Sequence, residues 1–202
     1  MSASPFAPQN NHKEGFAFIA QRTNQTLSLS QLMDEDIQPI NFLVDGLLSS
    51  GLYILAGPPK SGKSWLALWL CLCIAKGQPV WDLAVQPGGV LYLCLEDNKQ
   101  RLQNRLLDIL GEEAIPDLPV HFMLEADAAG TDLIQVLGRF VESHPATHLI
   151  VIDTLQKIRP EGVDHSYAGD YQIIGELKQF TPVPLSIPLR LKLIFISIPP
   201  LF

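Results

Sequence analysis

Apolar and polar positions alternate along most of this chain in a pattern typical of a parallel sheet covered by helices. From residue 52 onward, short continuous apolar runs alternate with longer segments whose apolar residues recur every three or four positions. The continuous runs predict buried strands over Leu52–Ala56, Val90–Leu95, Val120–Leu124 and Leu149–Ile152. The periodic segments predict helices over Lys63–Lys76, Lys99–Leu110, Asp132–Ser143 and Tyr171–Phe180. This order of elements favours an α/β fold of three layers, in which a mostly parallel sheet lies between helices.

Single residues mark the expected ends of these helices. Gly77 follows the first helix and is predicted to end it, because glycine adopts the left-handed conformation of a helix terminus. Short polar side chains that can accept from free backbone amides precede the others. We expect Asp97 to cap the second helix, Thr131 or Asp132 the third, and Asp170 the fourth.

The two ends of the chain differ from the middle in residue composition and in apolar pattern. Residues 1–30 are rich in Asn, Gln, Ser and Thr, and we expect a disordered or loosely attached lead-in there, before a core over residues 31–180. From Thr181 to Phe202 the chain has five prolines and no acidic residue. In this Pro-rich apolar tail only Leu191–Ile198 predicts a strand.

The segment Gly57–Ser64, Gly-Pro-Pro-Lys-Ser-Gly-Lys-Ser, fits the phosphate-binding pattern G-x-x-x-x-G-K-S between a predicted strand and a predicted helix. Gly57 and Gly62 allow the backbone to approach a phosphate closely, and the following amides point into one concavity at the positive end of the helix. Lys63 would place its ammonium between the β- and γ-phosphates, and the Ser64 hydroxyl would take one Mg²⁺ position. The sequence therefore predicts that this loop binds ATP with magnesium. The expected cofactor-binding residues are Gly57, Pro58, Pro59, Lys60, Ser61, Gly62, Lys63, Ser64 and Trp65.

Carboxylates follow two of the predicted buried strands, at the sheet edge where ligands bind in open α/β folds. Asp153 ends the apolar run Leu149–Ile152, and we expect it to hold Mg²⁺ opposite Ser64. Glu96 ends the run that begins at Val90 and could orient and deprotonate the water that attacks the γ-phosphate. Residue chemistry alone leaves an alternative open, in which Glu96 only begins the next helix, where acidic residues favour the dipole.

Together these elements resemble the RecA-like AAA ATPases of the RepA-type plasmid-replication helicase group, over roughly residues 40–180. The segments that carry the resemblance are Asn41–Leu48, Gly57–Trp65, Val90–Asp97 with Arg101 and Arg105 after it, Ile150–Ile158 and Tyr171–Phe180. The resemblance implies a RecA-like P-loop NTPase fold and Mg²⁺-dependent ATP hydrolysis, with Glu96 and Lys63 as catalytic residues. It also implies rings with nucleotide between subunits, and helicase-like work on single-stranded DNA in replication or in the maintenance of a mobile element.

The tail departs from this family. In the family, an apolar strand lies between the P-loop strand and the strand of the metal-side aspartate, ends in residues that sense the γ-phosphate, and is followed by a basic residue. Here Leu191–Ile198 is apolar enough for that central position, but Ser197 is the only polar group near its end and no basic residue follows. The change in composition predicts a truncated or frame-altered end and an incomplete C-terminal part. An alternative function therefore stays open, in which the chain is a nucleotide-binding module that does not hydrolyse ATP because the sensor region is missing. A P-loop kinase is disfavoured, because the sequence has no arginine-rich lid.

The composition of the chain limits the kinds of partner that it is expected to bind. The net charge of −7 and the pI of about 5.1 argue against a broad nucleic-acid-binding surface, although they allow a local basic groove. No apolar run is long enough to span a bilayer, so we expect no membrane association. The three cysteines lack the paired spacing of a zinc site and are expected to be buried, reduced thiols of a cytoplasmic protein.

Two pairs near the predicted site receive structural interpretations. Trp65 and Trp69 lie four residues apart on the helix after the loop, and this spacing predicts core packing. Lys157 and Arg159 follow the Asp153 strand and are expected to be a solvated basic pair.

Overall fold

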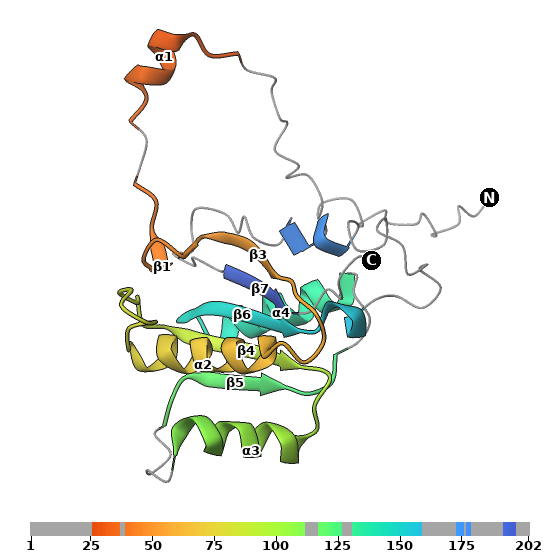
Figure 1. The fold of residues 1–202 in the computed structure, drawn as a ribbon. Helices are drawn as coiled ribbons and strands as arrows, with labels where there is room; N and C mark the ends of the chain where they lie inside the picture. The colour runs from red at the N-terminus through yellow and green to blue at the C-terminus, as the bar shows by residue number, and fades with distance from the viewer. Residues whose placement is uncertain are drawn as a thin grey trace, which may run out of the picture. The chain divides into compact units, whose positions relative to one another are not determined.

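The computed structural model describes residues 26–36, 39–111, 117–126, 131–158, 173–175, 177–178 and 192–196 (Figure 1). The chain divides into two compact units, residues 1–39 and residues 40–202. In the first unit, helix α1 (Leu29–Asp34) begins with a capping box. The Ser28 hydroxyl accepts from the Gln31 amide at 3.2 Å, and the Gln31 side chain accepts from the Ser28 amide at 2.9 Å. The polar sequence of this region does not predict such a short helix.

The second unit contains a sheet of five parallel strands in the order β3-β7-β6-β4-β5. The strands are β3 (Gly51–Leu55), β4 (Gly89–Cys94), β5 (Val120–Met123), β6 (Thr147–Asp153) and β7 (Lys192–Ile196). Each coincides with a predicted strand, with ends that differ by at most two residues. Strand β7 pairs with β3 on one side and β6 on the other, so the apolar tail segment takes the central position expected for it.

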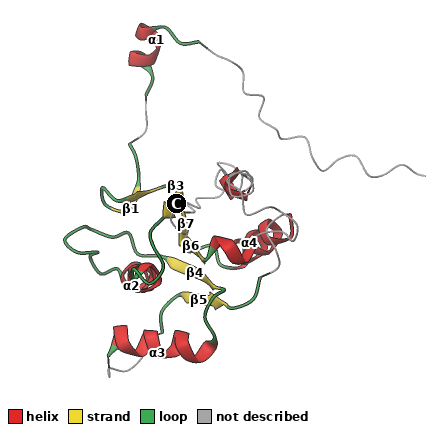
Figure 2. Ribbon diagram, turned by 45° about the vertical axis from the view of Figure 1, so that its right-hand side comes forward, coloured by secondary structure: helices red, strands yellow, loops and turns green. Residues whose placement is uncertain are grey.

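Helices cover both faces of this sheet (Figure 2). Helices α2 (Lys63–Lys76) and α3 (Lys99–Leu110) pack on one face, and α4 (Thr131–Ser143) packs on the other. Alternate residues of β4 point to opposite faces. Val90, Tyr92 and Cys94 pack with α2, whereas Leu91 and Leu93 pack with α4. The three-layer α/β fold predicted from the sequence is confirmed.

The helix ends match the expectations in one case and not in another. Helix α2 ends at Gly77, whose φ of 66° is left-handed and whose amide bonds back to the last turn. Helix α3 is capped by Asn98 and not by Asp97, so that prediction is wrong. Asn98 has the extended backbone of a capping residue, and its side chain accepts from the Arg101 amide at 2.9 Å. The Asp97 carboxylate is engaged by arginine side chains of the same helix.

A two-stranded hairpin, β1 (Phe42–Val44) and β2 (Leu48–Ser49), precedes the sheet. It is joined to the segment after α2 by backbone bonds: the Asp45 amide donates to Ala84 O at 2.8 Å, and the Gln86 amide to Leu43 O at 2.8 Å. All three cysteines are buried free thiols. None of the helices that the structure describes is long and apolar enough to cross a membrane.

The fourth predicted helix and the tail fall only partly within the described residues. Residues 173–175 and 177–178 are helical, and Ile173 and Leu177 are buried with α4 under the sheet. Asp170 and Ser197 lie outside the described residues.

Candidate active site

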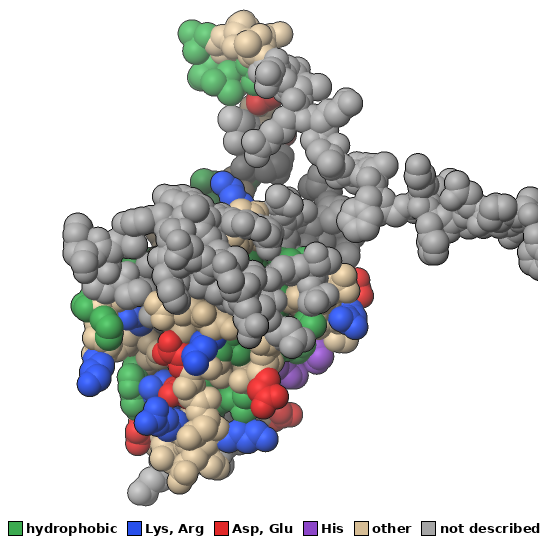
Figure 3. All heavy atoms as spheres, turned by 90° about the vertical axis from the view of Figure 1, so that its right-hand side faces the viewer, with side chains coloured by type: hydrophobic (Ala, Val, Ile, Leu, Met, Phe, Trp, Pro, Cys, Tyr) green, Lys and Arg blue, Asp and Glu red, His purple; other side chains and the backbone are tan. Residues whose placement is uncertain are grey.

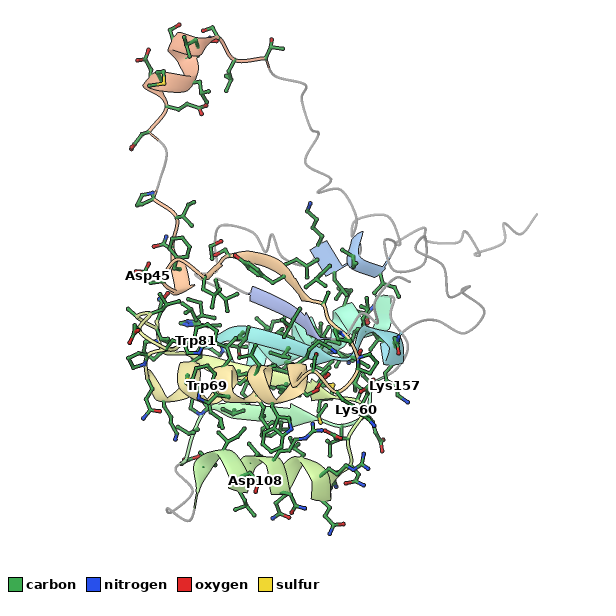
Figure 4. The ribbon with its side chains drawn as sticks, in the orientation of Figure 1. Asp45, Lys60, Trp69, Trp81, Asp108 and Lys157 are labelled. Carbon is green, nitrogen blue, oxygen red and sulfur yellow. The ribbon has the colours of Figure 1, made fainter. Side chains whose placement is uncertain are left out.

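The predicted site residues meet at the carboxyl edge of the sheet. Because β3, β4 and β6 run parallel, the segments that follow them emerge at one edge. The Leu95 amide donates to Asp153 O at 2.8 Å, which ties the end of β4 to the end of β6. Lys60, from the loop after β3, and Lys157, from the 3₁₀ helix Leu155–Ile158 after β6, lie at this same edge (Figure 4).

The loop Gly57–Ser64 runs from β3 into α2 in a conformation that its glycines permit. Gly62 has a φ of 85° and is the N-cap of α2, a left-handed position that favours glycine. A Cβ on Gly57 would lie 3.3 Å from Ser61 Oγ and 3.6 Å from Lys63 Cδ, so a side chain there would crowd the loop. No side chain caps α2 and no acidic residue lies in its first turn. The start of this helix is therefore an open, positive end suited to an anion.

The Lys63 ammonium lies over the loop itself. Its Nζ donates to Gly57 O at 2.9 Å and to Pro58 O at 2.8 Å. These bonds hold the positive charge against the backbone of the loop that leads into the open start of α2. A phosphate placed there would meet the ammonium and the helix dipole together.

Asp153 ends β6 in a buried position, with 3% of its surface exposed. Its Oδ2 accepts from the Tyr92 hydroxyl at 2.7 Å, whereas its Oδ1 has no hydrogen-bond partner among the described residues. Burial raises the pKa of the Asp153 carboxyl, while the hydrogen bond from Tyr92 and the nearby Ser64 hydroxyl favour its charged form. A buried carboxylate oxygen without a partner, close to the Ser64 hydroxyl, fits a hard cation that prefers oxygen ligands. The donor set is therefore chemically compatible with Mg²⁺.

Glu96 and Asp97 follow β4 but face different surroundings. Glu96 is an exposed residue whose carboxylate is partly desolvated. This desolvation and repulsion from Asp153 raise the pKa of Glu96, while Lys157 and Lys63 act to lower it. The carboxylate of Glu96 therefore lies within electrostatic reach of both lysines and of Asp153. Asp97 is instead paired with Arg105, and Arg101 lies 3.9 Å away from its other oxygen. Of the two neighbouring carboxylates, only Glu96 is left for chemistry at this edge.

Trp65 does not pack in the core, so that prediction is wrong. It is 39% exposed, and the Arg105 guanidinium lies 5.7 Å from the centre of its ring. Its position in the first turn of α2 directs it away from the sheet, toward α3. Trp69, one turn later, packs against the core and faces Trp81 at 5.7 Å between ring centres.

Comparisons with known proteins agree with this geometry. The sequence profile of the AAA domain family matches residues 20–182. The chain belongs to the AAA domain family. No curated protein matches the sequence of this AAA domain.

Among solved structures, two are similar to the AAA domain in fold. The first, described as an ATPase domain, is 16% identical, with a TM-score of 0.50, over 73% of this chain and 57% of that one. The second is a DnaB-like replicative helicase, solved in a study of its interactions with primase, with the same identity, TM-score and coverage of this chain. The AAA domain spans only 38% of that helicase. These similarities confirm the RecA-like P-loop NTPase fold.

Sequence reasoning missed three groups at the site of the AAA domain. Tyr92 lies in the middle of an apolar run, and nothing in that run shows that its hydroxyl reaches Asp153. Arg105 recurs at helical spacing like any surface residue, so its pairing with Asp97 is visible only in three dimensions. Lys157 is exposed, as expected, but the sequence does not show that its charge acts on the site, where it lowers the pKa of Glu96.

Proposed function

We propose that this AAA domain binds ATP with Mg²⁺ in the Gly57–Ser64 loop and hydrolyses it, as an ATPase of the RepA-type helicase group. The observation that carries the proposal is the convergence of four groups at one sheet edge. The loop brings the Lys63 ammonium and the Ser64 hydroxyl, β6 brings the buried Asp153, and β4 brings Glu96.

Binding would rest on the loop. The phosphates of ATP would take the place of the loop carbonyls as partners of Lys63, and the backbone amides from Lys60 to Ser64 would donate to phosphate oxygens. Trp65 follows the loop and would contribute to the same contacts. The exposure of its ring beside Arg105 leaves a face available for a ligand.

Ser64 and Asp153 would hold the metal. Magnesium in such sites takes one or two protein oxygens and completes its octahedron with phosphate and water, so this small donor set is sufficient. When bound, the ion would neutralise charge on the β- and γ-phosphates.

Glu96 would act as the general base. A water held between this carboxylate and the γ-phosphate would lose its proton to the carboxylate as the oxygen attacks phosphorus. Partial desolvation and the negative charge of Asp153 raise the pKa of Glu96, and this makes it a better proton acceptor than a fully solvated glutamate.

The proposal also includes a biological role, in which the ATPase acts in DNA replication or in the maintenance of a mobile element. It is supported by the sequence resemblance and by the similar structures, which are an ATPase domain and a replicative helicase. Lys and Arg side chains intermingle with Asp and Glu on the described part of the carboxyl-edge face (Figure 3). Such a mixed surface favours a narrow contact with single-stranded DNA, or a ring contact between copies, over a broad basic patch.

The deciding experiment measures ATP binding and hydrolysis with and without single-stranded DNA, in the wild-type chain and in Glu96→Gln. The matched control is Glu125→Gln, which removes an exposed carboxylate just beyond the end of the neighbouring strand β5. Turnover that is stimulated by DNA, lost in Glu96→Gln and kept in Glu125→Gln supports the proposal. Binding without turnover in the wild type would make the chain a nucleotide-binding module, and phosphate transfer to a small acceptor would make it a kinase.

A further inference from the structure

Tyr92 is a buried residue whose hydroxyl contacts the proposed metal ligand. It lies in the middle of β4, with 1% of its surface exposed, and its ring packs against Phe122 at 6.0 Å between centres. Its hydroxyl crosses to the neighbouring strand and donates to Asp153 Oδ2 at 2.7 Å. For packing alone a phenylalanine would be sufficient. A buried hydroxyl costs free energy unless it is hydrogen-bonded, so the tyrosine indicates a use for the bond.

The bond divides the two oxygens of Asp153 into different roles. Oδ2 is occupied by Tyr92, and Oδ1 is buried without a hydrogen-bond partner among the described residues. A carboxylate that is free to rotate could offer either oxygen, or both, to a cation. With Oδ2 fixed, the carboxylate has one orientation and presents one oxygen.

We propose that Tyr92 is a positioning residue that holds Asp153 so that only Oδ1 faces the metal coordinated beside Ser64. This inference rests on the proposed function, because it requires Mg²⁺ to bind at Asp153. Groups that hydrogen-bond to a metal ligand in this way typically change metal affinity by about 10- to 100-fold when they are removed. Tyr92 would therefore set how tightly the site holds magnesium, without touching nucleotide or metal itself.

The test is the Mg²⁺ dependence of nucleotide binding, measured with a fluorescent ATP analogue in the full chain, over a titration of MgCl₂ and in EDTA. In Tyr92→Phe, the MgCl₂ concentration for half-maximal enhancement should rise by about tenfold, whereas affinity in EDTA should stay as in the wild type. The matched control is Tyr53→Phe. It also removes a tyrosine hydroxyl with bonds of 2.8 Å, to the Ser49 amide and hydroxyl, but on β3 and away from Asp153. It should leave the Mg²⁺ dependence unchanged.

Two further variants separate the possible failures. In an Asp153→Asn background, adding Tyr92→Phe should have no further effect on Mg²⁺ dependence, because the oriented carboxylate is already lost. If the wild type binds nucleotide with an Mg²⁺ dependence that requires Asp153 and Tyr92→Phe behaves like the wild type, this inference is overturned and the proposed function stands. If binding in the wild type does not depend on Mg²⁺ or on Asp153, the metal site fails and the inference falls with it.

A second measurement, made on the wild-type chain, tests the proposal even if the Tyr92→Phe variant does not fold. In the wild-type chain labelled with 3-fluorotyrosine, the ¹⁹F resonance of Tyr92 should shift when MgCl₂ is added to the nucleotide-bound protein. The resonances of Tyr53, Tyr167 and Tyr171 are identified by their loss in the corresponding phenylalanine variants, which assigns the fourth to Tyr92. The resonance of Tyr53 should not shift. If the chemical shift of Tyr92 does not change with MgCl₂ although Mg²⁺ strengthens nucleotide binding, the proposal is overturned.

Discussion

The two connections that lead from a strand into a helix on the α2 face are built in opposite ways. Between β3 and α2, the helix begins at Gly62, which has no side chain to cap it, and the Lys63 ammonium bonds to the backbone of the preceding loop. Between β4 and α3, the helix begins at Asn98, which caps it, and the preceding Asp97 is paired with Arg105. Both connections lie at the same edge of the same sheet.

The contrast separates a helix start that serves the fold from one that serves a ligand. A helix leaves its first amides without intrahelical partners, and they must be satisfied by a cap, by water or by a ligand. The β4–α3 connection satisfies its amide and its carboxylate within the protein, so it adds stability. The β3–α2 connection leaves its helix start open to an anion, so it is expected to contribute affinity instead.

The largest expected effect is at Lys63. Lys63→Ala should lower ATP affinity by at least about 100-fold, because the ammonium contributes charge-assisted bonds to phosphate of about 3 kcal/mol in total. Isothermal titration with ATP and MgCl₂ measures this. Lys76→Ala is the control, since it removes a lysine from the last turn of the same helix, at the end far from the loop, and should leave ATP affinity unchanged. Unchanged affinity in Lys63→Ala would refute the site.

The pairing of Asp97 should matter for stability and little for binding. Arg105→Met should lower the free energy of unfolding by about 2 kcal/mol, because it leaves a mostly buried carboxylate without its closest cation. Urea denaturation measures the change. Arg101→Met is the control, since Arg101 is 72% exposed at 3.9 Å from Asp97 and should contribute less than about 0.5 kcal/mol. Equal losses in the two variants would show that Arg105 has no special role.

Gly62 is expected to matter both for the stability of the fold and for ATP binding. Gly62→Ala should destabilise the fold by about 1.5 kcal/mol through its positive φ alone, because its Cβ would meet no atom within 4 Å. It should also weaken ATP binding. Gly46→Ala is a close control: its φ is 64°, its Cβ would also meet nothing within 4 Å, and it lies in the hairpin turn away from the site. Both variants should lose similar stability, and only Gly62→Ala should lose affinity.

The smallest effect is expected at the α3 cap. Asn98→Ala should cost about 1 kcal/mol of stability and leave ATP affinity unchanged, because the cap satisfies an amide that no ligand uses. Thermal denaturation checks the stability. Asn104→Ala, an exposed position within α3, should be neutral or slightly stabilising, since alanine has the higher helix propensity. A loss of ATP affinity in Asn98→Ala would remove the distinction between the two connections.

The sequence was sufficient for the elements because their signals are local. Helices Lys63–Lys76 and Lys99–Leu110 have the predicted ends, since apolar spacing and a following glycine are readable within one segment. The loop Gly57–Ser64 and the carboxylates at strand ends were found for the same reason: their place in the order of elements implies their place at the edge of the sheet.

Pairings between distant segments could not be found in this way. The Tyr92 bond to Asp153 joins residues 61 positions apart, and it depends on β4 lying beside β6 in one register. The prediction that Asp97 caps α3 is wrong because its actual partner, Arg105, lies two helical turns further along the chain. Trp65 was placed in the core because spacing alone does not show which way the first turn of α2 faces.

The place of β7 has a consequence for how the chain is made. The P-loop strand β3 has only β7 as a partner among the described strands of the sheet, and β7 is formed by residues 192–196. During synthesis from the N-terminus, the loop Gly57–Ser64 is therefore translated long before the strand that joins it to Asp153 exists. Strands β4, β5 and β6 can pair among themselves earlier. Completion of the proposed ATP site must wait for a long-range parallel pairing, which is a slow class of folding step.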